Sequence, residues 1–197
     1  RRDRDDLAFG PNDDLYIVDA SANAIIKREA ATGDLSVFAT FDNIPNPTPV
    51  GPPSIHVVPT NIVFMDDRFY VSSLTGFPFL DGLAVIYEID LEGNVSVVHD
   101  NLTLLVDLAV HPGNDNLLAL QIGQFTLESG FLINTGAVLS PRGGYSVPQA
   151  ENLNMPSGMT FGADGRLYVT TLRDGEVRVL EAERVTNVEP APEAEVP

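Results

Sequence analysis

The segment Met159–Leu172, MTFGADGRLYVTTL, decides the fold of this chain. It reads as a short apolar strand, a tight Ala-Asp-Gly turn and a second strand rich in β-branched and aromatic residues. Similar segments start at Leu7, Ile62 and Leu108, so the four copies begin 55, 46 and 51 residues apart. A repeat of this length is typical of β-propellers, whose four-stranded blades need about 40–50 residues each.

We therefore predict an all-β protein, a β-propeller built of four-stranded antiparallel blades. Several expected strands are continuous apolar runs, such as Leu15–Val18 and Leu117–Leu120, which indicates that both faces of each sheet are covered. Four blades can close into a small propeller or form part of a six-bladed one. The predicted propeller covers residues 1–188, with blades near 5–43, 58–101, 104–153 and 156–188, and residues 189–197 form an acidic, proline-rich tail.

Composition excludes several classes of function. The 197 residues carry a formal net charge of −17, which argues against binding to nucleic acid or to an anionic membrane, since both favour a basic surface. No apolar run approaches the roughly 20 residues that span a bilayer, and the lack of cysteine excludes disulfides and thiolate catalysis. The chain opens with Arg1-Arg2-Asp3-Arg4 instead of a methionine or a signal peptide, which predicts a processed product or a piece of a longer protein.

The connections between strands divide between two faces of the predicted disc. Short Asp-, Asn- and Gly-containing turns fall on one face, whereas the long segments 41–57, 73–83 and 122–135 fall on the other. Loops on a rigid scaffold commonly carry binding sites, so we expect a small molecule or a protein partner on this long-loop face. Phe77 and Phe79 belong to it, and they either line a pocket for an apolar ligand or anchor their loop to the blade. Among the histidines, His56 is the one expected on this face.

Three segments carry a resemblance to a known family: DLAFGPNDDLYIVDASANAIIK, VPTNIVFMDDRFYVSSLTGFPF and LLVDLAVHPGNDNLLAL. They are similar to the ScyD/ScyE family, exported bacterial propeller proteins named from cyanobacterial scytonemin biosynthesis. The likeness extends to about Leu180 and corresponds to the later two-thirds of a family member. It implies a six-bladed propeller with an extracellular or periplasmic location in a bacterium. Because the activity of most members is undefined, it implies no reaction.

The repeats are more distantly similar to NHL-repeat proteins and to propellers of the gluconolactonase/regucalcin type. The latter hold a divalent metal at the channel mouth with Asn and Asp side chains at the start of the inner strands. By resemblance, the matching positions are Asp5, Thr60, Val106 and Ser157, of which the first alone is a strong oxygen ligand. One residue further along the chain stand Asp6, Asn61, Asp107 and Gly158. A shift of one residue turns a strand side chain to the opposite face, so the resemblance does not carry the metal site over intact.

We expect the binding site at the channel mouth and on the long-loop face. Its candidate residues are Asp19, Asn61, Asp107, Ser157, Phe77, Phe79 and His56. No cofactor is firmly implied, but Ca²⁺ or another divalent cation would suit the oxygens of Asp6, Asn61 and Asp107. The same Asp and Asn side chains are equally suited to capping turns and satisfying backbone donors.

No complete catalytic constellation is present in the sequence. The leading hypothesis is an exported propeller module that binds a ligand or a protein partner on its long-loop face. One alternative is a metal-dependent hydrolase of the lactonase type, with a cation at the central channel mouth. Another is a structural protein that completes its propeller with another chain, by self-association through open blade edges.

Overall fold

The computed structural model describes residues 4–142 and 145–180, and from Asp6 onward it also describes their side chains. This part is built almost wholly of β-strands, with two short 3₁₀ turns, η1 (Pro11–Asp13) and η2 (Ala20–Ala22), and it contains no α-helix. Within these residues, no helix is long and apolar enough to cross a membrane.

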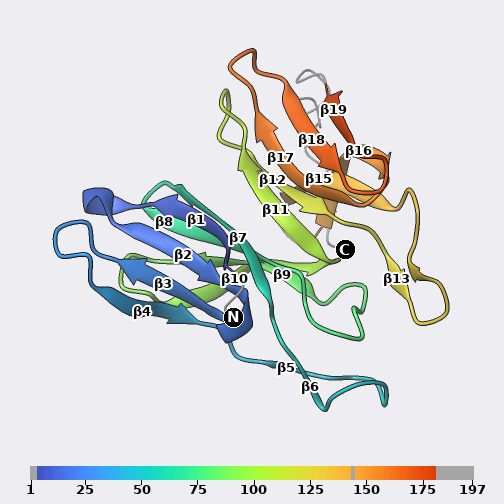
Figure 1. The fold of residues 1–197 in the computed structure, drawn as a ribbon, viewed down its shortest axis with the longest axis horizontal. Coiled ribbons are helices and arrows are strands. Elements are labelled where there is room, and N and C mark those ends of the chain that lie inside the picture. Colours follow the sequence, from blue (N-terminus) through green and yellow to red (C-terminus); the bar gives the residue numbers. More distant parts are fainter. Residues whose placement is uncertain (1–3, 143–144, 181–197) are drawn as a thin grey trace, which may run out of the picture.

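Four antiparallel sheets follow one another along the chain and spread as a fan, each forming one blade (Figure 1). Blade 1 contains β1 (Arg4–Phe9), β2 (Leu15–Asp19), β3 (Ala24–Arg28) and β4 (Leu35–Thr40). Blade 2 contains β7 (Pro59–Met65), β8 (Arg68–Ser73), β9 (Ala84–Ile89) and β10 (Val95–Leu102). Blade 3 contains β11 (Leu105–Val110), β12 (Leu117–Gln121), β15 (Gly136–Arg142) and β16 (Tyr145–Leu153).

Blade 4 contains β17 (Pro156–Phe161), β18 (Leu167–Thr171) and β19 (Glu176–Leu180). The end of the fourth predicted blade, at 181–188, and the tail at 189–197 lie outside the described residues. In each blade the strand order follows the chain, as the prediction of a propeller requires.

The core consists of three apolar layers, one between each pair of consecutive blades. The run in β12 shows how one strand supplies two layers, because successive side chains of a strand point to opposite faces. Leu118 and Leu120 pack toward blade 4, whereas Ala119 packs toward blade 2. The continuous apolar strands are therefore explained by sheets covered on both faces, and the predicted fold is confirmed.

Two of the long segments contain small hairpins of their own, which the sequence analysis did not predict. β5 (Ile44–Pro45) pairs with β6 (Ser54–Ile55), and β13 (Phe125–Thr126) pairs with β14 (Gly130–Phe131). Both pairs project from the fan on the side of the long segments (Figure 1).

The three long segments meet on one face, as predicted. The backbone N–H of Gly76 donates to the carbonyl of His56 at 2.8 Å. A Cβ on Gly51 would stand 3.0 Å from Cδ1 of the Phe77 ring, and the rings of Phe79 and Phe125 have centroids 5.1 Å apart. The proline-rich segment, the Phe-Pro-Phe segment and the β13–β14 hairpin thus form one continuous surface, which we call the long-loop face.

Candidate functional site

Each inner strand carries an irregularity at the same position of the repeat. The pairing with the second strand shifts between Pro59 and Asn61, and equivalent shifts occur in the other three blades, between Arg4 and Leu7, Leu105 and Asp107, and Pro156 and Gly158. A β-bulge bends the strand and re-aims the side chain beside it. This explains how Asp6, Asn61 and Asp107 converge although they stand one residue beyond the positions that the resemblance indicates.

These three side chains form a connected group, which we call the inner-strand cluster. The Asn61 amide nitrogen donates to Asp6 Oδ2 at 2.8 Å and to Asp107 Oδ1 at 2.6 Å. Each carboxylate also accepts from the backbone of the following blade, Asp6 from Ile62 N at 3.2 Å and Asp107 from Met159 N at 2.5 Å. The cluster therefore links all four blades through their inner strands.

Burial dominates the electrostatics of the cluster. Desolvation raises the pKa of Asp107 to about 6, and the neighbouring Asp6 charge adds to this, against the opposing hydrogen bonds from Met159 and Leu108. The pKa of Asp6 is likewise raised by burial. A carboxyl with a pKa near 6 changes its charge close to neutral pH, so the cluster is sensitive to protons and to any cation nearby.

The cluster has some, but not all, of the oxygen ligands that a cation site requires. Over the described residues, no group of three or more Asp, Glu, His or Cys side chains is placed to hold a metal. Asn61 Oδ1, however, is buried and has no hydrogen-bond partner in this part of the chain. Rotating that amide by half a turn would bring an oxygen, in place of the nitrogen, between the Asp6 and Asp107 carboxylates, which is the kind of oxygen set that Ca²⁺ prefers.

The other polar residues named in the sequence analysis have hydrogen-bond partners outside the inner-strand cluster. Asp19 is buried, and its Oδ1 accepts from Ala22 N at 3.0 Å at the start of η2. Ser157 is exposed, and its hydroxyl lies 3.1 Å from that of Thr170 in the same blade. Thr60, at a position matched by resemblance, is buried and donates to the Leu105 carbonyl at 3.1 Å, joining blades 2 and 3.

The predicted aromatic residues occupy the centre of the long-loop face. Phe79 is half-buried and packs against three rings, those of Phe77, Phe125 and Phe131, with centroids 5.1–6.1 Å away. Phe77 remains 42% exposed. Phe79 thus anchors its loop and presents a ring surface at the same time, so the two expectations for these residues are compatible. His56 is exposed beside this group, joined to it through its backbone carbonyl.

A cavity of about 250 Å³ opens beside Phe79 where the three long segments meet. Its lining residues are Thr48, Val50, Pro78, Phe79, Leu80, Asp81, Phe125 and Leu127. Sequence reasoning identified the segment 122–135 but singled out neither Phe125 nor Leu127. The available signal was the apolar character of these residues within a long polar connection.

Comparison with known proteins supports the fold and leaves the family open. No protein-family model and no curated protein matches the sequence. Solved structures do match. A chain in a nidogen/laminin complex aligns with a TM-score of 0.65 at 17% identity, over 94% of this chain and 63% of that one.

A putative gluconolactonase aligns with a TM-score of 0.60 at 12% identity, over 91% of this chain and 60% of that one. A virginiamycin B lyase from Staphylococcus aureus with quinupristin aligns with a TM-score of 0.57 at 14% identity, over 95% and 56%. The chain is a β-propeller. Its neighbours are propellers of the NHL, gluconolactonase and streptogramin B lyase type. At these identities the likeness concerns the fold alone, and the chain spans 56–63% of the length of these three structures. The similarity to the ScyD/ScyE family stays a prediction.

Proposed function

We propose that this protein is an exported propeller module that binds a small apolar or aromatic ligand on its long-loop face. The observation that carries the proposal is the cavity beside Phe79, which three separate segments build together. Pockets for small ligands are concave, largely apolar and supplied with a few polar groups that orient the ligand. The resemblance to exported propellers supports the location outside the cytoplasm.

The walls of the cavity have distinct chemistry. Phe79 and Phe125 offer ring faces and edges, which favour offset or edge-on packing against an aromatic ligand. Val50 adds apolar surface from the segment 41–57, and Leu127 adds it from the same segment as Phe125. Asp81 provides the acidic group, and partial burial raises the pKa of its carboxyl. A neutral ligand with one hydrogen-bond donor fits this combination better than an anion does.

The proposal is tested with N-phenyl-1-naphthylamine, a neutral probe whose fluorescence rises in apolar sites. Leu127→Asp places a carboxylate in the cavity wall, whereas Ile133→Asp makes the same kind of change in the same segment but outside the cavity. The two side chains are 61% and 58% exposed, so neither change disturbs the core. We expect Leu127→Asp to weaken saturable binding about tenfold, which corresponds to roughly 1.4 kcal/mol. Equal affinities of the two variants, or no saturable binding to the wild type, would contradict the proposal.

A second candidate function is a metal-dependent hydrolase of the lactonase type. It is favoured by the inner-strand cluster, in which two carboxylates face one amide whose oxygen has no partner among the residues that the structure describes. Asp6, Asn61 and Asp107 would hold the cation, which when bound would polarise a carbonyl. Calorimetric titration with Ca²⁺ tests this, with Asn61→Ala expected to abolish binding, and proton release from glucono-lactone tests the reaction.

We also propose that the protein self-associates through one face of blade 1, the face turned away from blade 2. Leu7, Phe9 and Val37 are 53%, 65% and 63% exposed there, while Ala8 and Phe38 on the same strands pack toward blade 2. This face resembles those that form the three inter-blade layers, so we propose that it pairs with a second copy of the chain. Mass measurement over a range of concentrations tests this, because a monomer at every concentration would contradict it.

A further inference from the structure

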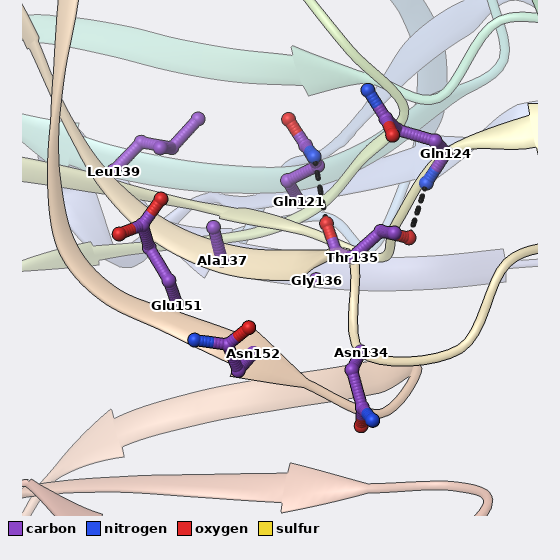
Figure 2. Close-up of a pocket in the computed structure, with 9 residues that line it drawn as sticks. All are labelled: Gln121, Gln124, Asn134, Thr135, Gly136, Ala137, Leu139, Glu151 and Asn152. Carbon is purple, nitrogen blue, oxygen red and sulfur yellow. Dashed lines mark hydrogen bonds between the residues drawn. The ribbon is translucent and has the colours of Figure 1, made fainter.

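A second cavity, of about 300 Å³, lies at the base of the β13–β14 hairpin, against blade 3 (Figure 2). Amide side chains dominate its rim and walls, joined by one carboxylate and one hydroxyl-bearing residue. Its lining residues are Gln121, Gln124, Asn134, Thr135, Gly136, Ala137, Leu139, Glu151 and Asn152. None of them is a lysine or an arginine, and none belongs to the inner-strand cluster or to the cavity beside Phe79.

The hairpin base is held in place by hydrogen bonds centred on Thr135. The Gln121 side-chain nitrogen donates to the Thr135 carbonyl at 3.0 Å, and Gln124 N donates to its hydroxyl oxygen at 2.9 Å (Figure 2). That hydroxyl in turn donates to the Leu132 carbonyl at 3.0 Å. Gly123 has a φ of +149°, and a side chain there would stand 2.8 Å from the same hydroxyl. The close approach requires glycine, so the cavity is a built feature of this loop.

The orientation of the fixed amide sets the chemistry of the cavity. The Gln121 side chain uses one of its two N–H groups for the Thr135 carbonyl, and it retains its carbonyl oxygen as an acceptor and its second N–H as a donor. Gln124, Asn134 and Asn152 each bring both a donor and an acceptor, and Glu151 brings a carboxylate. Ala137 and Leu139 add a small apolar surface on β15. Donors and acceptors beside an apolar patch match a ring that carries hydroxyls on its edge and C–H groups on its face.

The charge of the cavity selects against anions. Of the described residues that line it, Glu151 alone is charged, and the whole chain has a net charge of −17. The volume is at the lower limit of the range of about 300–1,000 Å³ for small-ligand pockets, which suits one ring-sized molecule. We propose that this cavity binds a neutral polyhydroxylated molecule, a single sugar or sugar-alcohol unit.

This site is separate from the apolar cavity of the proposed function. Gln124 directly precedes β13, and Phe125 is the first residue of that strand. Gln124 lines the polar cavity and Phe125 the apolar one, and the two cavities share no lining residue. The hairpin therefore divides the long-loop face into a polar and an apolar compartment, and either can be tested without the other.

The test is NMR titration of the isotope-labelled protein with methyl α-glucoside, methyl α-galactoside and mannitol, with glucuronate as the anionic comparator. We expect saturable shifts in the side-chain NH₂ signals of Gln121, Gln124, Asn134 and Asn152 with at least one neutral compound. We also expect glucuronate to bind more weakly than the corresponding neutral sugar.

Glu151→Gln sharpens the test, with Glu128→Gln as its matched control, since Glu128 is an exposed carboxylate on the same hairpin that does not line the cavity. Hydrogen bonds to a charged group are stronger than those between neutral groups. Glu151→Gln should therefore weaken neutral-sugar binding by roughly three- to tenfold. It should also reduce the discrimination against glucuronate, while Glu128→Gln changes neither. Absence of shifts across the whole neutral panel would overturn the proposal, as would equal effects of the two variants. If Glu151→Gln loses sugar binding but still binds N-phenyl-1-naphthylamine, the apolar site is intact. The two proposals are then tested separately.

Discussion

Replacing Asp107 with asparagine should remove a specific part of the pH dependence of stability. The Asp107 pKa is 3.8 as an ordinary carboxyl and about 6 in the folded protein. Between these values the native state binds more protons than the unfolded chain, so the free energy of unfolding falls as pH rises through the window. At 1.36 kcal/mol per pKa unit, the whole effect is about 3 kcal/mol.

A narrower window excludes the carboxyl groups of ordinary pKa, whereas Asp6 and Asp81, whose pKa values burial also raises, are present in the wild type and in the variant alike. Between about pH 5 and about pH 7.5, the same two pKa values give a loss of about 1.4 kcal/mol in wild-type stability. Asp107→Asn cannot titrate, so this component should vanish from the variant. The variant should also be less stable at the lower pH, because its amide turns a donor toward Met159 N–H or loses the Asn61 bond.

The assay is urea unfolding followed by circular dichroism at the two pH values, with a chelator present to exclude divalent cations. Asp164→Asn is the matched control. The Tyr168 hydroxyl and then the Arg166 backbone and side chain lower the pKa of Asp164 to about 2, so it is ionised in both states throughout the window. A pH difference in Asp107→Asn equal to that of the wild type would refute the reasoning.

Three further substitutions test the packing of the blades. Phe69→Ala removes a fully buried ring and should lower the free energy of unfolding by about 3–5 kcal/mol in urea titrations. Gly10→Ala places a carbon 2.6 Å from Tyr16 Cε2 and 2.7 Å from Phe69 Cζ, and overpacking should cost about 1–3 kcal/mol by the same measurement. Ser73→Ala leaves both the N–H and the carbonyl of Val85 without the hydroxyl that they bond, at a cost of about 1–3 kcal/mol, with faster hydrogen exchange at the Val85 amide.

The strands could be predicted because their signals are local. Leu15–Asp19, Ala24–Arg28 and Leu35–Thr40 are read from apolar runs between turn residues, and the structure has strands with these bounds. The hairpin β13–β14 could not be read in this way. Each of its strands has two residues, and Phe125 and Phe131 pack on Phe79 from another blade, so it depends on contacts that are remote in sequence.

The inner-strand cluster could be predicted from the sequence only in part. The position of Asp6, Asn61 and Asp107 within the repeat is enough to place them near the axis. They stand one residue beyond the positions that the resemblance indicates, however, and in a regular strand that shift would turn their side chains away from it. The bulges that resolve this conflict occur in all four inner strands, without a glycine at each one to mark them. Whether an oxygen or a nitrogen of Asn61 faces the carboxylates is set by the assembled blades, and no sequence pattern reports it.

The choice of asparagine at position 61 follows from the charges around it. Asp6 and Asp107 each accept a backbone N–H from the next blade, so the repeat would be completed by a third carboxylate in the middle. Three buried carboxylates in contact would repel one another and raise their pKa values further. An amide of the same size supplies a donor to both neighbours instead, and within residues 6–142 and 145–180 its own oxygen has no partner. The same exchange gives the cluster two alternatives, an amide nitrogen that links the blades or an amide oxygen that joins a cation, and Ca²⁺ would have to outcompete two hydrogen bonds to select the second.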